Sequence, residues 1–125
     1  MKTDRELLES AAKAAGLHVD MRSTIPDYLW VREIKRHGPY RAWNPLTDDG
    51  DALRLAVQLS LPLSFVSRDV WGAKEPAVLC GQKWNENDSQ YVPFREAHSG
   101  DPYAATRRAI VRAAAELAPP PVGAA

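Results

Sequence analysis

Three segments of the chain combine an N-terminal helix cap with an apolar stripe of helical spacing, and strand-like runs separate them. The first segment begins at Thr3, whose spacing to Glu6 is that of a capping box, and it ends at Gly16. The last begins with Asp101 and then Pro102, a residue that suits the first helical position. Amphipathic helices that alternate with strands must bury their apolar faces on each other. This order therefore predicts an α+β fold.

The middle helix follows the acidic stretch "TDDGD", which could instead be a metal site. Thr47 or Asp48 is in position to cap a helix whose apolar stripe includes Leu53, Ala56 and Val57. A calcium-binding loop would need a glutamate six positions after Gly50, and position 56 is alanine. We therefore interpret these carboxylates as the start of a helix.

The strand-like runs fall between the helices. Residues 27–34 and 39–43 predict a hairpin around "KRHG", residues 63–71 and 76–82 predict a second one, and 90–94 predict an edge strand interrupted by Pro93. The run at 27–34 is apolar on both sides, which indicates that both its faces are covered. We expect a layered helix/sheet/helix sandwich of order α-β-β-α-β-β-(β)-α with a mostly antiparallel sheet. Residues 1–118 would form one domain, and the Pro/Ala-rich residues 119–125 a disordered tail.

Composition narrows the class of protein. Sixteen basic residues balance sixteen acidic ones in a chain of 125, so no overall charge favours nucleic acid or an anionic membrane. Neither a secretory signal nor a run long enough to span a membrane is apparent, which predicts a cytoplasmic protein. The lone cysteine, Cys80, excludes an internal disulfide, and its apolar surroundings predict a buried structural thiol.

Patterns typical of catalysis or cofactor binding are weak. His18, His37 and His98 are far apart in the chain, and the glycines form no phosphate-binding loop. The run "HSGD" contains catalytic residue types, but adjacent residues seldom face one another as a triad must. We expect no enzyme, no metal and no cofactor.

Two basic groups and four tryptophans remain as candidates for binding. Arginines 107, 108 and 112 line the last predicted helix, and the predicted hairpin of residues 32–41, the basic hairpin, could be solvated, contact an acidic protein or bind nucleic acid. Trp30 and Trp43 are expected to pack in or near the core, whereas Trp71 and Trp84 adjoin turns, as interface anchors often do. The candidate protein-binding residues are therefore Arg32, Lys35, Arg36, Tyr40, Arg41, Trp71 and Trp84.

The segments "WNPLTDDGDALRLAVQL" and "DPYAATRRAIVRAAAEL", with the opening "TDRELLESAAKAAGL", resemble the phage ABA sandwich family. The resemblance implies a helix–sheet–helix sandwich of phage or prophage origin, and it brings no catalytic residues. It implies a structural role for the turn that starts the middle helix. This fold signature comprises Trp43, Asn44, Pro45, Thr47 and Asp48.

These observations favour a phage-encoded accessory protein that binds a host or phage protein. Small phage proteins of this kind often act against host processes or defences, CRISPR systems among them, so we expect an inhibitor. One alternative is a structural phage protein that assembles with itself. Another, which ranks lower, is a nucleic-acid-binding module that uses the basic hairpin.

Overall fold

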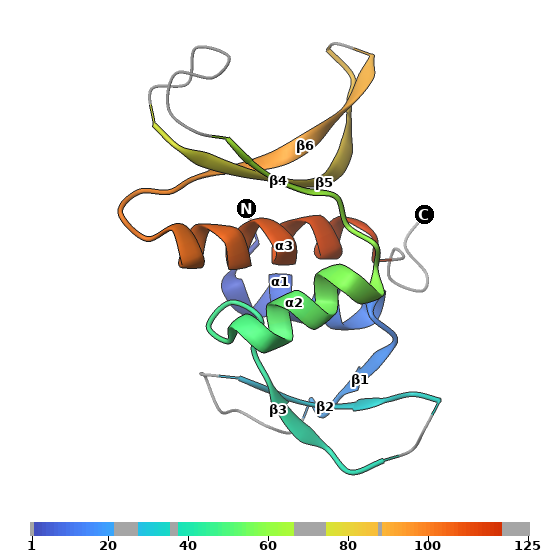
Figure 1. Ribbon diagram of the computed structural model, residues 1–125. Helices are drawn as coiled ribbons and strands as arrows, with labels where there is room; N and C mark the ends of the chain where they lie inside the picture. The colour runs from blue at the N-terminus through green and yellow to red at the C-terminus, as the bar shows by residue number, and fades with distance from the viewer. Residues whose placement is uncertain (1, 22–27, 36–37, 67–74, 88, 119–125) are drawn as a thin grey trace.

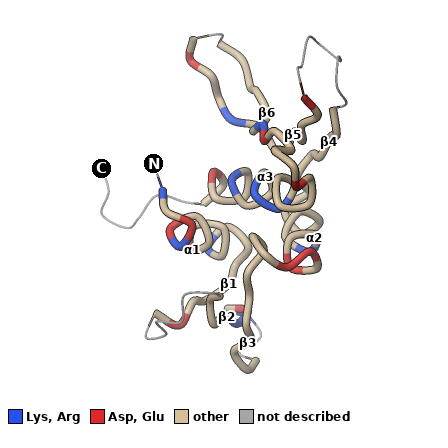
Figure 2. Tube along the Cα trace, turned by 90° about the vertical axis from the view of Figure 1, so that its left-hand side faces the viewer, with Lys and Arg blue, Asp and Glu red and all other residues tan. Residues whose placement is uncertain are grey.

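The computed structural model describes residues 2–21, 28–35, 38–66, 75–87 and 89–118. Within these residues, three helices lie between two three-stranded antiparallel sheets, in the order α-β-β-β-α-β-β-β-α (Figures 1 and 2). The α+β class and the antiparallel pairing are confirmed. The layers differ from the expected ones, because two sheets enclose the helices where one sheet enclosed by helices was expected.

The three helices begin where their caps predict. Thr3, Asp48 and Asp101 each accept a hydrogen bond from a backbone N–H of the first turn, so all three caps are confirmed. The helices are α1 (Asp4–Ala14), α2 (Asp49–Gln58) and α3 (Pro102–Glu116).

One sheet has the order β1-β2-β3 and packs beside α1. Its strands are β1 (Leu17–Val19), β2 (Leu29–Glu33) and β3 (Arg41–Trp43). Strand β1 was not predicted, because its three residues are too few to show a strand pattern. The expectation that both faces of the run at 27–34 are covered is wrong. Leu29 and Val31 are buried, whereas Trp30 and Arg32 on the other face are only half-buried.

The second sheet has the order β4-β5-β6 and packs on α3. Its strands are β4 (Leu63–Val66), β5 (Ala77–Asn85) and β6 (Gln90–Ala97). The predicted edge strand around Pro93 is confirmed as β6, and it is longer than expected. Residues 67–71 of the predicted strand lie outside the described residues.

Helix α3 is the centre of the core, and alanines make this possible. It contacts both other helices as well as β5 and β6. Ala109 and Ala114 have no exposed surface, and Ala113 lies against Gly81 of β5. Small side chains let the helices and the sheet approach α3 closely from several sides at once.

Gly81 marks a bulge that changes the direction of the β5–β6 hairpin. Cys80 pairs with Phe94 but Lys83 pairs with Val92, so β5 carries one extra residue at this point. Gly81 has a φ of 70°, and a Cβ atom there would lie 2.5 Å from the Cβ of Ala113. Glycine is therefore required both by the backbone conformation and by the close approach of α3. Beyond the bulge the hairpin rises away from the helices (Figure 1).

The buried face of α2 differs from the expected one. Ala52, Leu55 and Ala56 are buried, whereas Leu53 and Val57, which we expected in the core, are exposed. Tyr103, in the first turn of α3, is exposed as well. Ala52, Leu55 and Ala56 therefore form the face of α2 that packs in the core, and Leu53 and Val57 are left at the surface.

Candidate interaction surfaces

The acidic turn before α2 is held together by its own side chains. Asp51 is buried, and its carboxylate accepts hydrogen bonds from the Asn44 backbone N–H at 3.0 Å and from Arg54 Nη2 at 2.8 Å. Asp48 caps the helix by accepting from the Asp51 N–H at 2.8 Å. Since these oxygens bond within the protein, the turn has a structural role, as expected. Across the described part of the chain, no group of three His, Cys, Asp or Glu residues is arranged to hold a metal ion.

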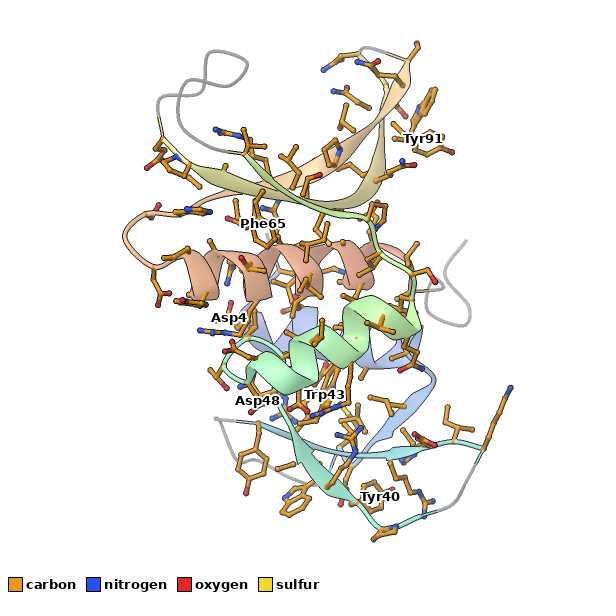
Figure 3. The ribbon with its side chains drawn as sticks, in the orientation of Figure 1. Asp4, Tyr40, Trp43, Asp48, Phe65 and Tyr91 are labelled. Carbon is orange, nitrogen blue, oxygen red and sulfur yellow. The ribbon has the colours of Figure 1, made fainter. Side chains whose placement is uncertain are left out.

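The fold signature residues belong to this turn. Trp43 and Pro45 are buried, and Asn44 Oδ1 accepts a hydrogen bond from the Leu46 N–H at 2.9 Å. The backbone N–H groups of Thr47 and Asp48 both donate to the Asn44 carbonyl. Trp43 and Asp48 lie beside α2, on the side of the β1-β2-β3 sheet, in Figure 3. The prediction that Trp43 packs in the core is confirmed.

Two of the described arginines of the basic hairpin, Arg32 and Arg41, contact other side chains of the protein. The Arg32 guanidinium lies 4.9 Å from the centre of the Tyr40 ring, and the Tyr40 hydroxyl hydrogen-bonds to His18 Nδ1 at 2.9 Å. Arg41 Nη1 lies 3.8 Å from the buried carboxylate of Asp51. Lys35 is exposed, and Arg36 and His37 lie outside the described residues.

The arginines of α3 each connect this helix to another element. Arg107 Nη1 contacts Asp49 of α2 at 2.6 Å, and Arg108 Nη1 contacts Asp4 of α1 at 3.0 Å. Arg112 Nη1 contacts Glu96 of β6 at 2.6 Å. Figure 2 marks these basic positions along α3, beside the other helices and below the second sheet. These three arginines therefore form ion pairs between elements of the same chain.

An exposed aromatic pair lies near the far end of the β5–β6 hairpin. Trp84 and Tyr91 are paired across the two strands, with ring centroids 5.1 Å apart in an edge-to-face arrangement. They expose 51% and 65% of their surface. Their register places them on the sheet face opposite Phe94, which is buried toward α3. Tyr91 is seen in Figure 3 well away from the helices.

A second apolar surface lies between β4, α2 and α3. It is a groove of about 420 Å³, and we call it the β4 groove. Leu53, Leu63, Phe65 and Tyr103 line it, together with Ile110 at its base. Figure 3 shows Phe65 directed from β4 toward α3. This surface was not predicted from the sequence, because Leu53 was expected on the buried stripe of the middle helix.

Two further candidates for chemistry, Cys80 and Asp101, have structural roles. Cys80 is buried, as predicted, and burial raises the pKa of its thiol to about 11. Asp101 of the "HSGD" run accepts hydrogen bonds from the N–H groups of Tyr103 and Ala104, as a helix cap does. Among the described residues, no helix is both long and apolar enough to cross a membrane.

The candidate protein-binding residues do not form one surface. The basic hairpin belongs to the β1-β2-β3 sheet, whereas Trp84 belongs to the β4-β5-β6 sheet on the other side of the helices (Figure 1). Trp71 lies outside the described residues. Tyr91, which the sequence analysis did not select, is the direct neighbour of Trp84. Its position beside Pro93 in an edge strand is the signal that could have identified it.

Comparison with known proteins found no family model, curated protein or solved structure that matches this chain. The resemblance to the phage ABA sandwich family at residues 43–48 therefore stays a prediction.

Proposed function

We propose that this chain is a phage- or prophage-encoded accessory protein that binds another protein through the Trp84–Tyr91 pair. The observation that carries the proposal is the position of this pair. Both rings are largely exposed, and both lie beyond the Gly81 bulge, where the hairpin has left the helical layer (Figure 3). Exposed aromatic side chains in such positions are typical anchors of protein interfaces.

The physical properties of the pair support this use. Each ring presents a large apolar area that gains free energy when a partner removes it from water. The edge-to-face contact holds the two rings against each other before binding, so less side-chain entropy is lost in the complex. Exposed charged and amide side chains of the turn that follows Trp84, including Glu86 and Asn87, can form the polar rim of an interface.

The nature of the partner rests on the family resemblance. A small phage protein without a catalytic constellation is expected to act by occupying a surface that a host protein needs. We therefore propose inhibition of a host process or a host defence, with CRISPR systems as one class of target, in the cytoplasm of the host cell.

Nucleic-acid binding by the basic hairpin has weaker support. Arg32 stacks on Tyr40, and Arg41 lies beside Asp51, so neither guanidinium is fully available to phosphate groups. The chain also has no net positive charge to draw nucleic acid toward it.

Capture of partners from a lysate of the natural host, with a tagged full-length protein, tests the proposal. One stoichiometric partner should be retained by the unaltered protein and lost with Trp84→Ala or Tyr91→Ala. For the purified complex we expect each change to raise Kd at least about tenfold, since buried aromatic anchors contribute roughly 2 kcal/mol or more.

Met21→Ala is the control, because Met21 is a large apolar residue that exposes 66% of its surface and belongs neither to the aromatic pair nor to the β4 groove. It should leave the Kd unchanged, and circular dichroism should show all three variants folded. A complex that survives both hairpin substitutions would contradict the proposed surface.

A further inference from the structure

The outer edge of β4 carries backbone groups that point away from its own sheet. The Gly81 N–H donates to the Pro62 carbonyl at 2.9 Å, and Leu63 and Phe65 lie opposite Cys80 and Val78. Hydrogen-bonded and non-hydrogen-bonded pairs alternate in an antiparallel ladder. Leu63 and Phe65 are therefore in non-hydrogen-bonded pairs, and their N–H and C=O groups face outward. Among the described strands, only β5 lies beside β4.

The same two residues direct their side chains into the β4 groove. Their partners Cys80 and Val78 are buried toward α3, and residues directly opposite in a sheet lie on one face. Phe65 is nevertheless 65% exposed, and Tyr103 across the groove is 70% exposed. An added strand at this edge would thus meet free backbone groups and an apolar groove together.

The edge lacks the charged side chains that often prevent pairing with another strand. Residues 62–66 contain no charged side chain, and lysine is the commonest guard on natural sheet edges. At the rim of the groove, Arg107 and Asp49 neutralise each other at 2.6 Å. Two copies of this surface can approach each other without repulsion between like charges.

We propose that a second copy of the chain occupies this edge, with the two β4 strands pairing antiparallel about a two-fold axis. Leu63 of each copy would lie opposite Phe65 of the other, which uses the four outward-facing N–H and C=O groups. The two sheets would join into one of six strands. Since this axis is perpendicular to the sheet, both helical layers would lie on the same side, with the two grooves facing each other.

We choose a second copy as the occupant because β4 itself offers the backbone groups and the apolar side chains that would fit this edge and the β4 groove. It is an extended segment with two apolar side chains on one face, and its outward-facing backbone groups are in complementary register. Stable interfaces bury roughly 800 Å² per partner. Two aromatic side chains of about 150–250 Å² each supply part of this area. Leu53, Leu63 and the backbone of β4 supply more.

The first test is the mass of the full-length protein in solution, measured by light scattering across a wide concentration range. We expect twice the chain mass of 13.8 kDa. Phe65→Lys should return the protein to a single-chain mass while circular dichroism shows it folded. Tyr91→Lys is the matched control, since Tyr91 is an aromatic strand residue with the same 65% exposure, and it should leave the mass doubled.

The second test probes the register directly. The axis would pass between the two copies of Ser64, a non-hydrogen-bonded pair with Cα atoms about 4.5 Å apart, within disulfide range. Ser64→Cys should form a covalent dimer under mild oxidation, and Gln90→Cys, exposed on the far side of the sheet, should not. A single-chain mass at all concentrations would overturn the proposal. So would a doubled mass that survives Phe65→Lys, or a dimer that Ser64→Cys fails to cross-link.

Discussion

Asp51 shows how one residue can organise a turn that looks like a binding site in the sequence. Its carboxylate accepts from the Asn44 N–H and from Arg54, and Arg41 lies nearby, so it connects the residues before α2 to the first turn of that helix. Asp48 and Asp49, its neighbours, are exposed. The cap at Asp48 is predictable because it depends on local spacing. The burial of Asp51 is not, because it depends on where β3 meets α2.

Removal of the Asp51 carboxylate should destabilise the protein. We expect Asp51→Ala to lower the free energy of unfolding by about 1–3 kcal/mol, because a buried backbone N–H and an arginine lose their acceptor. Urea denaturation followed by tryptophan fluorescence measures this. Asp49→Ala is the control in the same helical turn. The Asp49 carboxylate is exposed, so its ion pair with Arg107 should contribute less than about 1 kcal/mol. An equal loss in both variants would contradict this role for Asp51.

At the scale of elements, the helices were easier to predict from the sequence than the strands. Caps and helical periodicity depend on residues a few positions apart, and all three caps were predicted correctly. Which side of α2 is buried depends on α3, and so the prediction for Leu53 and Val57 was wrong. The division of the strands into two sheets depends on contacts between segments distant in the sequence. For the same reason the β4 groove could not be predicted.

Two effects should destabilise a Gly81 variant, namely the strained backbone conformation and the close contact with Ala113. A comparison with Gly16 distinguishes them. Gly81→Ala should destabilise the protein by roughly 2–4 kcal/mol, since the positive φ disfavours alanine and the new methyl group meets Ala113. Gly16→Ala has the same kind of strain, with a φ of 74°, but nothing lies within 4 Å of the added Cβ. It should cost only about 1–2 kcal/mol. Thermal or urea unfolding of both variants compares the two, and equal losses would show that the contact with Ala113 is unimportant.

On the scale of the whole molecule, α3 is the element that contacts both other helices and the second sheet. Its alanines admit close neighbours, and its three arginines reach α2, α1 and β6 in turn. The net charge of the sequence is zero, and these three basic residues are paired with specific acidic residues on other elements. From sequence alone these arginines formed a basic flank that could bind a partner, because the acidic residues that meet two of them are far away in the chain.

The interactions of Arg107 and Arg108 should contribute differently to the free energy of unfolding. Arg107 also donates from Nε to the Leu46 carbonyl at 2.8 Å and is mostly buried, whereas Arg108 and Asp4 form an exposed pair. We expect Arg107→Met to lower the free energy of unfolding by about 1–2 kcal/mol. Arg108→Met should lower it by less than about 0.5 kcal/mol. Both are measured by urea unfolding at one protein concentration, because self-association would change apparent stability. A larger effect at Arg108 would contradict this order.

The bulge at Gly81 also has a consequence for how this protein can change over generations. Buried residues of the hairpin, such as Cys80 and Phe94, lie on the helix side of the bulge, and the side chains beyond it are mostly exposed. Mutations beyond the bulge thus carry little penalty for folding, while they alter the shape and chemistry of the outer arm. A few substitutions in this part of the β5–β6 hairpin would change which partner it binds and leave the fold intact. We also expect the fold to tolerate a different sequence inserted between Asn85 and Gln90.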